Sequence, residues 1–112
     1  MLTEQQKNNC LKVDPLAEDF GITVRTLKDK VIKVRDDHSC NICEAEIIKG
    51  ALARTRVEIF DNAFHTYYWC NTCCLAMSNL IDNTENADYE YQERYSIGER
   101  LRKDRYDREN IN

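Results

Sequence analysis

Two Cys-x₂-Cys pairs constrain this chain more than any other feature of its sequence. Cys40 and Cys43 form the first pair, Cys70 and Cys73 form the second, and residues 44–69 separate them. Two thiolates separated by two residues fit a tight turn that points both sulfurs toward one metal ion, and two such pairs complete a tetrahedral Zn²⁺ site. A chain of 112 residues has a limited hydrophobic core and gains much from such a site. We therefore predict one structural zinc ion bound by these four cysteines.

Two alternatives to zinc use the same cysteines. Unmetallated buried cysteines would behave as small hydrophobic side chains, and four thiolates can also hold an iron–sulfur cluster. No basic and apolar leader is visible at the N-terminus, so we expect a cytoplasmic protein in a reducing compartment, where disulfides are disfavoured. Cys10 and Cys74 remain outside the pairs, and Cys74 would point about 100° away from Cys73 on a helix.

The residues around the second pair predict a hairpin followed by a helix. Residues 54–60 alternate between polar and apolar side chains and residues 63–69 are aromatic, so both favour strands, while Asp61-Asn62 is typical of a turn. Apolar residues then recur at helical spacing, at Cys74, Met77, Leu80 and Ile81, until Asp82-Asn83 ends the run. The order of a cysteine turn, a hairpin and a helix predicts an α+β fold of the treble-clef zinc-finger type over residues 33–83.

Three short motifs extend this pattern. A basic residue and a histidine precede the first pair in Lys33-Val-Arg-Asp-Asp-His-Ser-Cys40, an Ile48-Lys49-Gly50 turn follows it, and the aromatic Tyr68-Trp69 precedes the second pair. Residues 33–77 therefore resemble small treble-clef zinc-binding proteins of bacteriophages and prophages, with Ala51 where the commoner residue is Glu. The resemblance implies the fold, a zinc ion, a phage origin and a location in the host cytoplasm.

The N-terminal segment, residues 1–32, allows two interpretations. Residues 16–31 have the spacing of a helix-turn-helix with its turn at Gly21. In that arrangement four side chains would face DNA, namely Thr23, Arg25, Thr26 and Lys28. Alternatively, residues 22–34 are rich in β-branched side chains and would form a hairpin with its turn at residues 28–30.

The C-terminal segment, residues 84–112, is highly charged and contains no proline, which predicts a solvated helix, although Gly98 weakens the pattern. It carries four tyrosines at positions 89, 91, 95 and 106. Tyr91 and Tyr95 would share one helical face and are our candidate partner-binding residues, because tyrosine is enriched in protein interfaces. Packing of the tyrosines on the zinc domain, or a disordered tail, are the alternatives.

Charge and histidine content bear on function. Asp and Glu number 20 against 16 Lys and Arg, and the net charge of −4 gives no help to non-specific nucleic-acid binding. A His-Asn-His nuclease would need more histidines than His38 and His65, and a zinc ion held by four cysteines has no open position for water. We therefore expect no enzyme.

The expected function is that of an accessory protein that binds and modulates a host or phage protein, for example as an inhibitor. The alternative is a DNA-binding regulator that uses residues 16–31.

Overall fold

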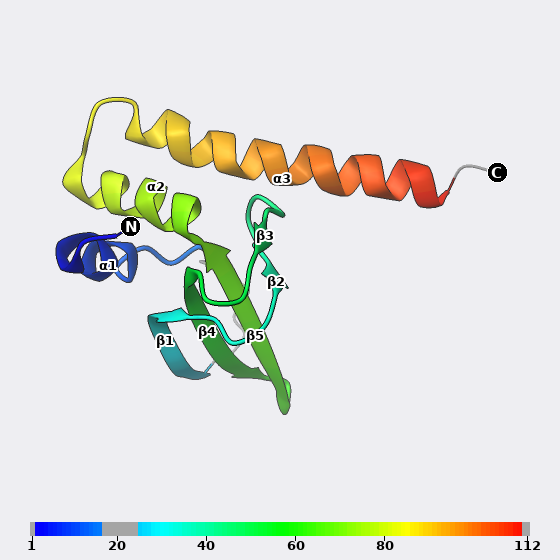
Figure 1. The fold of residues 1–112 in the computed structure, drawn as a ribbon, viewed down its shortest axis with the longest axis horizontal. Coiled ribbons are helices and arrows are strands. Elements are labelled where there is room, and N and C mark those ends of the chain that lie inside the picture. The colour runs from blue at the N-terminus through cyan, green and yellow to red at the C-terminus, as the bar shows by residue number, and fades with distance from the viewer. Residues whose placement is uncertain (1, 17–24, 111–112) are drawn as a thin grey trace.

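The computed structural model of the chain describes residues 2–16 and 25–110, which form an α+β fold (Figure 1). In chain order its elements are α1 (Glu4–Cys10), β1 (Arg25–Lys33), β2 (His38–Ser39), β3 (Glu46–Ile47), β4 (Leu52–Phe60), β5 (Ala63–Cys70), α2 (Asn71–Asp82) and α3 (Ala87–Glu109). β1, β4 and β5 form an antiparallel sheet with β4 in the middle, while β2 and β3 form a separate two-stranded ribbon. Among the described residues, no helix is long and apolar enough to cross a membrane.

The predicted hairpin and the helix after it are confirmed. Asp61 and Asn62 both have positive φ angles, 52° and 61°, which is the backbone of a two-residue hairpin turn. The turn sets the register of β4 and β5, with Phe60 opposite Ala63. Helix α2 begins directly after β5 and ends at Asn83, which adopts the left-handed conformation common at helix ends.

Strand β1 corrects both interpretations of the N-terminal segment over its described part. Residues 25–31 are extended, so the helix-turn-helix lacks its second helix, and residues 28–30 continue the strand instead of turning. Asp29 explains the continuation, because its carboxylate accepts two hydrogen bonds of 2.8 Å from Arg54 on β4. Residues 17–24, which include Gly21 and Thr23, lie outside the described residues.

Helix α1 was not predicted, although a local signal for it exists. Thr3 and Gln6 form a capping box in which each side chain accepts a hydrogen bond from the other's backbone N–H. The helix packs against α2, and Asn9 donates a hydrogen bond of 2.9 Å to Asp82 at the end of that helix. The N-terminal residues therefore belong to the same packed unit as the second cysteine pair.

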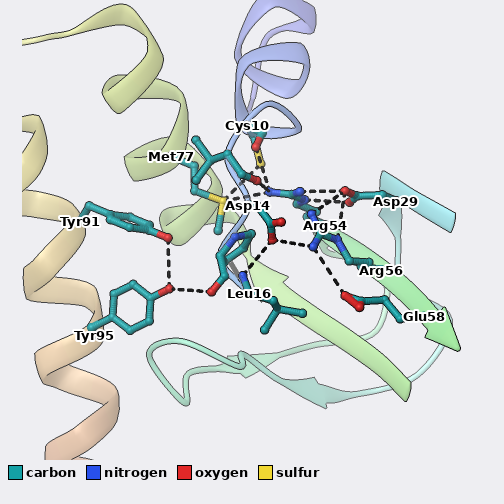
Figure 2. Close-up of polar contacts among 12 residues, drawn as sticks. Cys10, Asp14, Leu16, Asp29, Arg54, Arg56, Glu58, Met77, Tyr91 and Tyr95 are labelled. Atoms are coloured by element: carbon teal, nitrogen blue, oxygen red, sulfur yellow. Dashed lines mark hydrogen bonds and ion pairs between the residues drawn. The ribbon is translucent and has the colours of Figure 1, made fainter. Parts of the chain in front are cut away.

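Helix α3 is confirmed as a helix, and its candidate partner-binding tyrosines pack partly against the core. Tyr91 and Tyr95 are half-buried and pack against the core, with their rings edge to face at 5.2 Å. Their hydroxyl groups are 3.1 Å apart, and Tyr95 donates a hydrogen bond to the carbonyl of Pro15 (Figure 2). Burial raises the pKa of Tyr91, and the hydrogen bond with Tyr95 adds to this effect. The structure therefore shows the packing alternative for this pair, while Tyr89 and Tyr106 are exposed.

Gly98 is required where α3 crosses the turn that follows β2. A Cβ atom at this position would lie 1.7 Å from the carbonyl oxygen of Ile42, which is a severe overlap with backbone. A neighbouring contact ties the same surfaces together, because Arg102 and Arg105 both pair with Glu44, at 2.7 and 3.3 Å. The glycine that weakens the helix in the sequence thus permits its close approach to the cysteine turn.

Replacing Gly98 with alanine should therefore destabilise the folded protein by about 1–3 kcal/mol, the usual cost of overpacking. An isolated helix would respond in the opposite direction, since alanine favours helix by about 1 kcal/mol over glycine. Urea unfolding of the metal-loaded protein measures the difference. Ser96→Ala, at an exposed position of the same helix, is the control and should change stability by no more than about 0.5 kcal/mol. Greater stability of Gly98→Ala would mean that α3 does not rest on Ile42.

Candidate metal centre

The four cysteines of the two pairs meet in one buried cluster. Cys40 and Cys43 lie in the turn between β2 and β3, Cys70 is the last residue of β5, and Cys73 lies in the first turn of α2. Their sulfur atoms all lie within 4.8 Å of one another. The Cys40–Cys73 and Cys43–Cys70 sulfurs are 3.7 and 3.6 Å apart. A tetrahedron with metal–sulfur bonds of about 2.3 Å has edges of about 3.8 Å. The four side chains are thus positioned to hold one metal ion.

Backbone hydrogen bonds fix the two cysteine turns. In the first turn the N–H of Glu44 donates to the carbonyl of Cys40, and Glu44 itself has a positive φ of 65° that reverses the chain. The second pair uses the start of α2, where the N–H of Cys73 donates to the sulfur of Cys70 at 3.4 Å. The N–H of Cys70 donates to the sulfur of Cys40 at 3.3 Å and so joins the two turns. Donors of this kind favour the thiolate form.

Proton affinity is divided unequally among the four thiols. A hydrogen bond with Cys40 is the main cause that lowers the pKa of Cys70 to about 6. The pKa of Cys43 is also lowered, first by its hydrogen bond with Cys40, whereas the pKa values of Cys40 and Cys73 are raised. The thiolate form, which is the form that metal ions bind, is therefore favoured at Cys43 and Cys70.

Arg94 is a member of the site that its sequence position does not reveal. It projects from α3, and its Nε donates a hydrogen bond of 3.5 Å to the sulfur of Cys73. Burial alone would lower the pKa of Arg94, but the contact with Cys73 raises it above its ordinary value. Four thiolates around a divalent metal carry a net charge of about −2, and Arg94 offsets part of this charge. Arg94 lies 21 residues after Cys73 in the sequence, so no local spacing pattern predicts that it contacts the cluster.

The two spare cysteines form a separate buried contact. Cys10 and Cys74 are both fully buried, and a hydrogen bond with Cys74 is the main cause that lowers the pKa of Cys10. The sulfur of Cys10 also lies 3.7 Å from that of Met77, and Cys74 donates to the carbonyl of Trp69 at 3.6 Å. Neither Cys10 nor Cys74 belongs to the four-cysteine cluster. Cys74 points away from that cluster, as its helical position next to Cys73 predicts.

Neither histidine is part of the cysteine cluster in the described residues. His38 lies on β2, and its ring stacks on that of Tyr68 with centroids 3.7 Å apart and planes 11° from parallel. His65 lies on β5 opposite Glu58, with its ring 5.8 Å from that of Phe60. The two rings are therefore held by the sheet and its neighbours.

Comparisons with protein-family models, curated proteins and solved structures found no match to this chain. No relative therefore supplies a function by similarity.

Proposed function

We propose that the four cysteines bind one structural Zn²⁺ ion and that residues 33–83 form a treble clef around it. The support is the chain order, in which a cysteine turn, the β4–β5 hairpin and α2 follow one another and the two turns converge. Sulfur separations close to those of a tetrahedral thiolate site favour zinc, whose structural sites are four-coordinate and rich in cysteine.

From this centre we propose a non-catalytic role. The single observation that carries it is the complete set of four buried cysteine ligands, because such a set leaves no coordination position for water or substrate. The ion would then stabilise a scaffold, and the activity would lie in what the scaffold binds. We propose a small accessory protein that binds and modulates a host or phage protein. The phage origin rests on the resemblance of residues 33–77 to phage proteins.

The protein-binding surface that we propose lies between α2 and α3. Leu75, Ala76 and Tyr89 line a groove there, and Tyr89 is 69% exposed although it is a large aromatic side chain. Arg94 and Glu93 border the same groove and would give it polar contacts at the rim. Since Tyr91 and Tyr95 are engaged within the chain, Tyr89 replaces them as the proposed anchor. Residues 25–31 form a strand, so this proposal makes no use of a helix-turn-helix.

Capture from a bacterial lysate on immobilised zinc-loaded protein tests this role, with two exposed tyrosines of α3 compared. The wild type and Tyr106→Ala should retain the same protein in near-stoichiometric amounts, whereas Tyr89→Ala should not. With the captured protein purified, calorimetry should show binding weakened by about 2 kcal/mol or more in Tyr89→Ala, the scale of an interface anchor. Equal binding by both variants would refute the groove. Zinc-dependent turnover of a substrate would refute the non-catalytic role.

A further inference from the structure

The two faces of the sheet differ in what covers them. Directly paired residues of neighbouring strands share a face, so the register assigns every paired position to one face or the other; Leu27, at a register shift in β1, has no partner on β4. One face carries Arg54, Arg56 and Trp69 and packs against α1, α2 and the residues that follow α1. We call the opposite face, near the β4–β5 turn, the basic face. It consists of Arg25, Lys28, Lys30, Thr55, Val57, Ile59, Phe64, Thr66 and Tyr68.

Charge on the basic face is of one sign. Its nine residues include three cations and no carboxylate, because Asp29 and Glu58 point to the opposite face. A groove continues this charge past β1, where Lys33 and Arg35 join Lys28 and Lys30 along its lining, with Asp36 as its single acidic residue. The chain has a net charge of −4, yet five cations line the basic face and the groove that adjoins it.

These cations are not neutralised within the described residues. Across residues 2–16 and 25–110, no ion pair or hydrogen bond to a carboxylate involves Arg25, Lys28, Lys30, Lys33 or Arg35. On the opposite face, by contrast, Arg54 and Arg56 are fully engaged with Asp14, Asp29 and Glu58. Unpaired cations gathered along a groove attract an extended polyanion.

The basic face also carries two aromatic side chains, Phe64 and Tyr68. Phe64 is 72% exposed at the start of β5, which is unusual for a side chain of its size and apolarity. Tyr68 lies further from the hairpin tip on the same face and forms a flat stacked pair with His38. The two positions are four residues apart, or about 13 Å along the strand. Figure 1 shows the hairpin tip projecting away from the helices, so α1, α2 and α3 do not cover it.

We propose that the basic face binds single-stranded nucleic acid. Its lysines and arginines would contact the phosphates, and unstacked bases would stack on Phe64 and on the His38–Tyr68 pair. Aromatic platforms combined with a basic groove are the chemistry by which proteins hold single strands, whereas the bases of a duplex are already stacked and cannot reach such rings. An acidic peptide would satisfy the cations but not the exposed ring of Phe64. The surface shares no residue with the α2–α3 groove, so either proposal can fail without the other.

Fluorescence anisotropy with the zinc-loaded full chain tests this proposal. The probes are fluorescein-labelled oligothymidine and oligouridine of about 12 nucleotides, a duplex of equal length, and an oligoglutamate peptide. We expect both single strands to bind and the duplex and peptide to bind at least about tenfold more weakly. The DNA and RNA arms show which strand is preferred.

Two variants and a matched control locate the site. Lys28→Gln with Lys30→Gln should weaken binding at least about tenfold at low salt and reduce the salt slope by about 1.4, or about 0.7 for each phosphate that is no longer neutralised. Phe64→Ala should weaken binding about tenfold while leaving the salt slope unchanged, because stacking releases no counterions. Lys12→Gln with Lys103→Gln removes two exposed cations outside the basic face and should have little effect on affinity.

Three results would overturn the proposal. The first is absence of binding to either single strand at low salt by a protein that carries its metal. The second is duplex or peptide binding as strong as single-strand binding, which would indicate a charge-only surface or an acidic protein partner. The third is an equal loss of affinity in the control variant, which would show that net charge rather than this face determines binding.

Discussion

Replacing Cys43 with serine should prevent binding of the proposed zinc ion and leave the chain largely unfolded. Cys43 is completely buried, and its sulfur lies 3.6 Å from that of Cys70, across the junction of the two cysteine turns. Structural zinc contributes about 10–16 kcal/mol of apparent binding free energy in small fingers, while whole domains are stable by only about 5–15 kcal/mol. Loss of one ligand therefore removes an amount comparable to the total stability. Circular dichroism and elemental analysis of the purified variant measure both consequences.

The spare cysteine Cys74 provides the control for this experiment. It is as buried as Cys43 and follows Cys73 of the cluster in the sequence, but its side chain contacts Cys10 and the carbonyl of Trp69 instead of the cluster. Cys74→Ala should keep one equivalent of zinc and remain folded, with a modest loss of stability from the cavity. A folded Cys43→Ser protein free of metal would show that the ion is not structural. Loss of metal in Cys74→Ala together with retention in Cys43→Ser would show a different set of ligands.

Features encoded by neighbouring residues could be predicted from the sequence. The spacing within each cysteine pair, the Asp61-Asn62 turn and the apolar period after Cys70 are all local, and each corresponds to an observed element. The union of the two pairs in one cluster followed from their matching spacing, because a shared metal is the simplest reason for two identical pairs. The capping box that begins α1 was equally local, at Thr3 and Gln6, and could have been found.

Features that depend on distant partners could not be predicted in the same way. Residues 25–33 favour a strand, but the partner that keeps residues 28–30 extended is β4, a segment distant in the sequence, where Asp29 also forms an ion pair with Arg54. Gly98 and Arg94 gain their roles only where α3 crosses the cysteine cluster. The burial of Tyr91 likewise depends on tertiary packing, since an amphipathic pattern indicates a contact face without naming what it contacts.

Replacing Arg54 with leucine should destabilise the metal-loaded protein by about 3–5 kcal/mol, the range for removing one partner of a buried ion pair. Arg54 is fully buried at the centre of the network in Figure 2. It forms two bonds of 2.8 Å to Asp29 and donates to the carbonyls of Cys10 and Val13 at 2.9 and 2.7 Å. Leucine fills much of the volume but donates no hydrogen bond. The carbonyl of Cys10 keeps its bond from the N–H of Val13, whereas the carbonyl of Val13 loses its bond of 2.7 Å from Arg54, and a buried unpaired group costs about 1–3 kcal/mol.

Urea unfolding with an exposed arginine as control distinguishes this network from a general loss of charge. Arg100 is 70% exposed in its side chain and approaches Glu93 only at 3.9 Å, so Arg100→Leu should change stability by no more than about 0.5 kcal/mol. Arg54→Lys should recover only part of the loss, because an ammonium group cannot reproduce the paired bonds to Asp29 together with those to two carbonyls. Equal midpoints for Arg54→Leu and Arg100→Leu would mean that the buried network does not join the N-terminal residues to the sheet. A graded loss from Arg100→Leu through Arg54→Lys to Arg54→Leu is the result expected if the guanidinium geometry itself holds α1, β1 and β4 together.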